Sequence, residues 1–170
     1  KIENMSLQHS ETKSKKRTPL AVLAVASGDG MAALFRSMGA DGIISGGQTN
    51  NPSAEEFIRA FDEAAADKII VLPNNKNIIM AAEQAVKLAD RKVCVLQTRT
   101  IPQGISAMLA FDESLDFAEN RIAMTKAFEK VATGQITFAA RDSDYEGHSI
   151  KQGEILALDN GKLAFTDKDV

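Results

Sequence analysis

Short apolar runs alternate with segments of helical spacing along the first part of the chain, and this alternation restricts the possible folds more than any other feature. The runs cover residues 20–26, 42–45, 67–72 and 92–97, and they recur at intervals of roughly 25 residues. A run that is apolar throughout is typical of a strand buried on both faces of a sheet. Because strands that alternate with helices form βαβ units, the sequence predicts an α/β fold with a parallel sheet.

The pattern changes after the last of these runs. A polar loop leads into a helix that ends at Leu109, and a longer helix is predicted over residues 115–132, with Ile122 on its apolar stripe. Short alternating strands are then predicted at residues 135–140, 154–158 and 162–166. Asp159-Asn160-Gly161 is typical of a tight hairpin, whereas residues 142–153 are predicted to be a polar connection. We therefore expect an antiparallel β extension beside the parallel sheet.

These patterns divide the chain into three parts. Residues 1–18 are polar, with a basic cluster at residues 13–17, and are predicted to be a linker or a disordered end. A patch for nucleic acid or anionic lipid is the alternative for this cluster. Residues 19–133 are predicted to be the α/β domain, and residues 134–170 the short β extension. Since the chain begins at Lys1 rather than Met, we expect it to be a piece of a longer protein, with the extension incomplete.

The composition excludes several classes of protein. The 170 residues include 44% hydrophobic and 25% charged side chains, which is typical of one globular domain with a substantial core. The net charge of −3 argues against a nucleic-acid-binding protein. No apolar stretch approaches the roughly 20 residues of a membrane span, and no signal peptide is visible. The single cysteine, Cys94, lies within an apolar run, so we expect a buried thiol in a reduced, cytoplasmic protein.

Residues suited to catalysis or metal binding are sparse. The two histidines, His9 and His148, are far apart, and neither belongs to a motif with serine or cysteine, so both are predicted to be surface residues. Asp142 and Asp144 favour a hydrated turn over a metal or acid–base site. Residues 27–30, Ser-Gly-Asp-Gly, lack the third glycine of a dinucleotide fingerprint, so a βα turn is favoured over nucleotide binding. We expect no catalytic residue, no metal and no cofactor in this chain.

Three polar loops follow predicted strands and would meet at one edge of a parallel sheet. The first contains Gly46 and Gly47, which allow backbone geometry that a β-carbon would forbid, and it ends at Ser53, the predicted start of a capping box with Glu56. The cations of the other two loops, Lys76 and Arg99, suit a phosphate or carboxylate group. The loops form either one binding surface or three independent turns. The candidate binding residues are Gly46, Gly47, Gln48, Thr49, Asn51, Asn74, Asn75, Lys76, Asn77, Thr98, Arg99, Thr100 and Gln103.

The same loops carry a family resemblance. Gly-Gly-Gln-Thr-Asn-Asn-Pro-Ser (residues 46–53), Leu-Pro-Asn-Asn-Lys-Asn-Ile-Ile-Met-Ala-Ala (72–82) and Thr-Ile-Pro-Gln-Gly (100–104) occur in this order. They resemble the C-terminal region of the dihydroxyacetone-kinase-like proteins of Gram-positive bacteria, which include the ATP-binding subunit of bacterial fatty acid kinase. Residues 1–9 resemble the segment just before that region. The family often has Met at the position of Asn50, so Asn50 is not expected to be an essential ligand.

The resemblance implies a fold similar to DegV-like proteins and to the substrate-binding subunit of dihydroxyacetone kinase. It also implies a non-catalytic module that docks a DegV-like fatty-acid-binding protein. An N-terminal domain absent from this chain would bind ATP and magnesium and phosphorylate the fatty acid for phospholipid synthesis. The implied partners are therefore the carrier and the kinase and middle domains of the parent chain. Family members also continue beyond the final hairpin with further α/β structure.

Two other hypotheses compete with docking. The loops could bind a small anion or a dihydroxyacetone-like molecule, which predicts a concavity around Lys76. The chain could instead form a homodimer, which predicts an exposed sheet edge near residues 163–166. Docking of a carrier predicts exposed asparagine-rich loops without a pocket.

Overall fold

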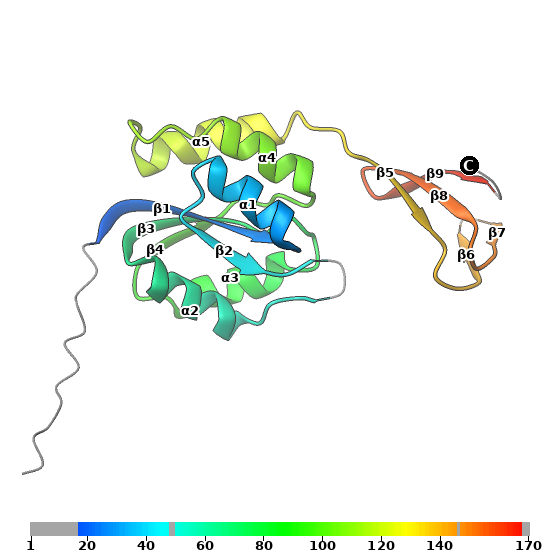
Figure 1. The fold of residues 1–170 in the computed structure, drawn as a ribbon, viewed down its shortest axis with the longest axis horizontal. Helices are drawn as coiled ribbons and strands as arrows, with labels where there is room; N and C mark the ends of the chain where they lie inside the picture. Colours follow the sequence, from blue (N-terminus) through cyan, green and yellow to red (C-terminus); the bar gives the residue numbers. More distant parts are fainter. Residues whose placement is uncertain (1–16, 48–49, 146, 168–170) are drawn as a thin grey trace, which may run out of the picture.

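A computed structural model describes residues 17–47, 50–145 and 147–167 and confirms the α/β fold (Figure 1). Its centre is a four-stranded sheet in the order β2-β1-β3-β4, and all the neighbouring strands are parallel. The strands are β1 (Thr18–Ala26), β2 (Gly42–Ser45), β3 (Ala66–Leu72) and β4 (Lys92–Val95). Because β1 and β3 are central and buried on both faces, residues 21–26 of β1 and 69–72 of β3 are apolar without alternation.

Helices cover both faces of the sheet (Figure 1). On one face lie α1 (Asp29–Ser37), α4 (Ile101–Leu109) and α5 (Phe117–Phe128), and on the other lie α2 (Ala54–Ala64) and α3 (Ile79–Leu88). Successive residues of β1 face opposite sides, so the sheet supports two separate cores. Val22 packs in a cluster with Phe35 of α1, whereas Leu23 packs in a cluster with Phe57 and Phe61 of α2.

Side-chain caps fix where several helices begin. The predicted capping box at α2 is confirmed, since Ser53 Oγ accepts from the Glu56 N–H at 3.3 Å and Glu56 Oε2 accepts from the Ser53 N–H at 2.7 Å. A second capping box, which the sequence analysis missed, joins Asp116 and Glu119 at the start of α5. Each box satisfies backbone N–H groups that a helix start otherwise leaves without partners.

The C-terminal strands form two small antiparallel sheets beside the α/β layers (Figure 1). The larger sheet has the order β5-β8-β9, with β5 (Gly134–Phe138), β8 (Ile155–Asp159) and β9 (Lys162–Asp167). The predicted tight turn is confirmed by positive φ angles of 50° at Asn160 and 80° at Gly161. The predicted polar connection is wrong, because it contains a hairpin of β6 (Ser143–Tyr145) and β7 (His148–Ile150).

Large apolar side chains lie exposed on the three-stranded sheet. Ile136, Phe138 and Phe165 are 79%, 66% and 57% exposed. The register places Ile136 opposite Ala157, and Ala157 in turn pairs with Phe165, so Ile136 and Phe165 lie on the same face of the sheet. Phe138 lies on that face too, because it is two residues from Ile136 in β5. Strand β9 forms one edge of this sheet. Among the described residues, no helix is long and apolar enough to cross a membrane.

Candidate functional site

The loops that follow β2 and β3 are joined by a hydrogen bond at the carboxyl edge of the sheet. The Asn75 side chain donates from Nδ2 to the Gly47 carbonyl at 3.2 Å, and its Oδ1 accepts from the Asn77 N–H at 2.9 Å. Gln48 and Thr49 lie outside the described residues. The first two predicted loops therefore meet, as expected for neighbouring parts of one sheet edge.

The two glycines of the first loop are required by close packing. A β-carbon at Gly46 would lie 2.6 Å from Pro52 Cδ, and one at Gly47 would lie 2.9 Å from Ser27 Cβ. Neither glycine is among the residues with positive φ. Gly46 and Gly47 are therefore needed for steric reasons and not for the special backbone geometry expected from the sequence. Any larger residue at these positions would push the loop away from the end of β1.

Asn74 and Thr98 are buried beneath the loops and bind each other. Asn74 has a positive φ of 57° and donates from Nδ2 to the Val25 carbonyl of β1 at 3.0 Å. Thr98 Oγ1 donates to Asn74 Oδ1 at 2.8 Å and accepts from the Asn74 N–H at 3.0 Å. Gly104 of α4 packs directly on this side chain. The network joins β1, β3, α4 and the segment after β4, so these two candidate residues position the loops from below.

Four other candidates are exposed and define what we call the loop surface: Asn51, Lys76, Asn77 and Arg99. Thr100 and Gln103 are half-buried and hold Arg99 in place, since the Arg99 N–H donates to Gln103 Oε1 at 2.7 Å. Thr100 is also the N-cap of α4. The loop surface thus presents two cations and two amides, and hydrogen bonds hold the backbone N–H groups of Asn77 and Arg99.

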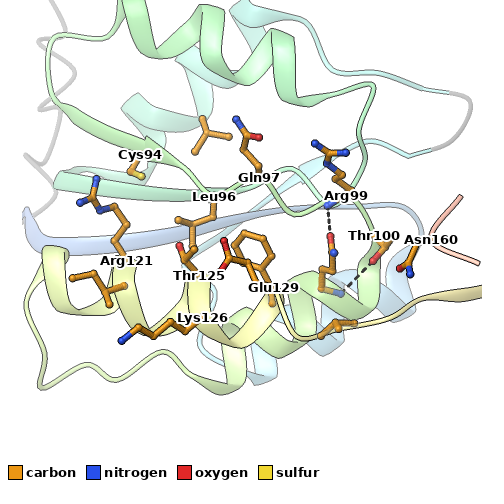
Figure 2. Close-up of a pocket in the computed structure, with 15 residues that line it drawn as sticks. Cys94, Leu96, Gln97, Arg99, Thr100, Arg121, Thr125, Lys126, Glu129 and Asn160 are labelled. Atoms are coloured by element: carbon orange, nitrogen blue, oxygen red, sulfur yellow. Dashed lines mark hydrogen bonds between the residues drawn. The ribbon is translucent and has the colours of Figure 1, made fainter.

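A groove of about 930 Å³ lies between β4 and α5, next to the loop surface (Figure 2). We call it the β4–α5 groove. Arg99, Thr100 and Gln103 line it, whereas Lys76 does not. Its other lining residues are Cys94, Val95, Leu96, Gln97, Arg121, Ile122, Thr125, Lys126, Phe128, Glu129, Val131 and Asn160.

Helix α5 contributes to this groove, which the sequence pattern did not predict. Ile122 was expected to face the core, but it is 50% exposed and lines the groove. Arg121, Thr125 and Glu129 follow the same side of the helix at intervals of one turn. The irregular apolar stripe of α5 was the signal that this helix covers the sheet only in part.

Cys94 is half-buried in the groove wall, so the expectation of a fully buried thiol is wrong. The reason is that β4 is the last strand of the sheet, and no strand among the described residues pairs with its outer edge. Burial raises the pKa of the Cys94 thiol, and the nearby Arg121 guanidinium partly opposes this rise.

The remaining candidates for chemistry lie apart from the loops. Asp142 accepts from the Gln152 N–H at 2.8 Å and pairs with Lys151 at 3.2 Å, and these contacts hold the pKa of its carboxyl below the usual value. Within the described ranges, no three His, Cys, Asp or Glu side chains are grouped so that they could hold a metal. His9 lies outside these ranges. Gly28, at the turn before α1, has a positive φ of 79°, as the predicted βα turn requires.

Comparison with known proteins gives one family match and several close relatives. The model of the FakA-like C-terminal family, which is named after a protein of fatty acid kinase, matches residues 21–170. An uncharacterized protein of Staphylococcus epidermidis is 41% identical over 98% of this chain, and protein YloV of Bacillus subtilis is 40% identical over 99%. An uncharacterized protein of Staphylococcus aureus is 37% identical over 99%. The chain spans about a third of each relative, since the matched regions cover 33%, 32% and 32% of their lengths.

Proposed function

Because this chain belongs to the FakA-like C-terminal family of fatty acid kinase proteins, we propose that it is the non-catalytic module by which such a kinase protein docks a DegV-like fatty-acid-binding protein. In this proposal, an N-terminal kinase domain of the parent chain binds ATP and magnesium and phosphorylates the presented fatty acid in the cytoplasm. The relatives support a parent of this kind, because they extend well beyond the matched region.

The fixed loop surface is the observation that carries the proposal. The Asn75–Gly47 hydrogen bond and the buried Asn74–Thr98 pair hold the described loop residues around Asn74 and Asn75 in place, so these residues lose little conformational entropy when a partner binds. Lys76 and Arg99 are exposed on this surface and would attract an acidic patch on the carrier.

Binding of a small anion by the asparagine-rich loops is less well supported. That hypothesis predicts a concavity around Lys76, whereas the β4–α5 groove has Arg99 in its lining but not Lys76. Thermal unfolding distinguishes the two functions, because a ligand that binds the folded state raises its melting temperature. We expect a rise with the fatty-acid-loaded carrier, and none with ATP–magnesium or dihydroxyacetone.

Calorimetric titration of the chain with a fatty-acid-loaded DegV-like protein tests docking directly. We expect Lys76→Glu and Arg99→Glu each to weaken binding about tenfold or more, because each reverses a charge that faces the partner. Lys87→Glu is the matched control, since Lys87 is exposed near the end of α3, far along the helix from the loops. Absence of any complex would refute docking. Equal affinity of the unmodified chain and the three variants would show that the docking site is not the loop surface.

A further inference from the structure

The outer edge of β4 is open. On its inner side β4 pairs with β3 through registers such as Ile70 with Cys94, but no described strand pairs with its other side. An open edge presents unpaired backbone N–H and C=O groups, which are a template for another strand. The β4–α5 groove runs along this edge, so there is room for a strand to approach (Figure 2).

The residues that α5 contributes to the groove are self-complementary. Thr125 lies at the centre of this set, with the exposed Ile122 three residues before it and the buried Phe128 three residues after it, so the outward-facing symmetry comes from the charged residues. Arg121 and Glu129 are four residues away on either side and carry opposite charges. Two copies of this stripe, placed antiparallel, would bring Arg121 of each against Glu129 of the other.

These two charges cannot satisfy each other within one chain. They are eight residues apart on the same helix, which corresponds to about 12 Å along its axis. The other two cations that line the groove lie to the sides of this stripe: Lys126 points away from β4, and Arg99 points away from α5 (Figure 2). The charges that face outward between Lys126 and Arg99 are therefore those of Arg121 and Glu129. A second copy rotated by 180° would place its Glu129 against Arg121 and its Arg121 against Glu129.

We infer that the β4 edge and α5 form a two-fold symmetric interface with a second copy of this chain. A two-fold axis uses the same patch on both copies, so it requires the self-complementary pattern that α5 provides. In this dimer, β4 pairs antiparallel with β4 of the second copy and the parallel sheet becomes continuous across the axis. This edge differs from the β9 edge expected from the sequence. The dimer does not rest on the proposed docking function, because it is argued from the β4 edge and the charges of α5; of the loop surface, Arg99 also lines the groove, whereas Lys76 and Asn77 do not.

Sedimentation equilibrium over a range of concentrations tests the dimer, with twice the 18.3 kDa chain mass as the expected limit. Charge reversal tests the interface. Arg121→Glu and Glu129→Arg should each weaken dimerisation at least about tenfold, because each places like charges together at two symmetric positions. Mixing the two variants should restore a dimer, because every contact in the mixed pair is again between opposite charges. Lys130→Glu, an exposed neighbour that does not line the groove, should leave the dimer unchanged.

The single cysteine provides an independent measure of where the copies meet. Cys94 lines the groove, so its rate of reaction with a thiol reagent should fall as the protein concentration rises through the dimer range. A monomeric mass at every concentration would overturn the interface. A dimer that leaves Cys94 reactive, or that ignores both charge reversals, would also overturn it and would place self-association elsewhere, for example at β9.

Discussion

Gly104→Ala tests whether the buried Asn74 network positions the loops. Gly104 lies inside α4, where alanine is normally preferred to glycine by about 1 kcal/mol. A β-carbon at this position, however, would lie 2.1 Å from Asn74 Oδ1 and 2.8 Å from Asn74 Nδ2. Packing and helix propensity therefore predict effects of opposite sign for the same substitution.

The magnitude follows from what Asn74 must give up. Moving its side chain breaks the bonds to Val25 and Thr98 in a site where Asn74 is only 6% exposed. Each buried polar group left without a partner costs about 1–3 kcal/mol. After the gain in helix propensity, we expect a net loss of about 2–3 kcal/mol in the free energy of unfolding. For a chain of this size that loss lowers the melting temperature by roughly 5–10 °C.

Urea unfolding followed by helical circular dichroism measures the loss. Gly30→Ala is the matched control, because Gly30 also lies in a helix and nothing lies within 4 Å of an added β-carbon. Asn74→Gly provides the second background, since glycine tolerates the positive φ at this position. In that background Gly104→Ala should no longer destabilise the protein. Two results would refute this reasoning. One is that Gly104→Ala has the same free energy of unfolding as Gly30→Ala. The other is that Gly104→Ala lowers the free energy of unfolding equally with and without the Asn74 side chain.

Two further predictions concern the caps and ties of the α/β layers. The pKa of Asp116 is lowered because its carboxylate accepts from the Glu119 and Ala118 N–H groups. The stability that the ionised carboxylate contributes is therefore present above about pH 4 and is lost as pH falls through the folded-state pKa. Asp116→Asn keeps a capping oxygen without that titration, so its stability should fall less steeply between about pH 5 and 2 in acid unfolding; parallel curves would contradict this. Arg91→Ala should cost about 1–3 kcal/mol in urea unfolding, because it removes the donor to the Phe61 carbonyl at 2.9 Å and to Asp62 at 2.8 Å. Lys87→Ala is its exposed control, and equal stability of these two variants would show that the Arg91 contacts contribute nothing.

Local pattern was sufficient to predict most of the fold. The strands β1 and β3 are continuous apolar runs, and the Ser53–Glu56 box marks the start of α2 within a few residues, so strand, helix and cap could be placed without tertiary information. The β6–β7 hairpin could not be predicted in this way. All three residues of β6 are exposed, so its sequence has no apolar alternation to separate it from a loop.

The candidate site was harder to predict because polar residues at strand ends serve two purposes. Asn74 and Asn75 are identical neighbours in sequence, yet one is buried and holds β1 while the other is half-exposed and holds Gly47. Only the three-dimensional arrangement distinguishes them, since burial depends on α4, which comes much later in the chain. The groove residues of α5 were missed for a related reason. Whether Ile122 faces the core depends on where the sheet ends, and a sequence does not show which strand is the last one.

The tip of the β8–β9 turn has a mechanical consequence. The Asn160 Oδ1 accepts from the Thr133 N–H at 2.9 Å, the Asn160 N–H donates to the Thr133 carbonyl at 2.8 Å, and the Thr133 hydroxyl lies 2.9 Å from that of Thr100. Thr133 therefore connects the β extension to the N-cap of α4. A shift of the β extension would first strain the contact between Thr133 and Thr100, the residue next to Arg99. The loop surface and the β extension are thus joined through two hydroxyl groups and one asparagine side chain.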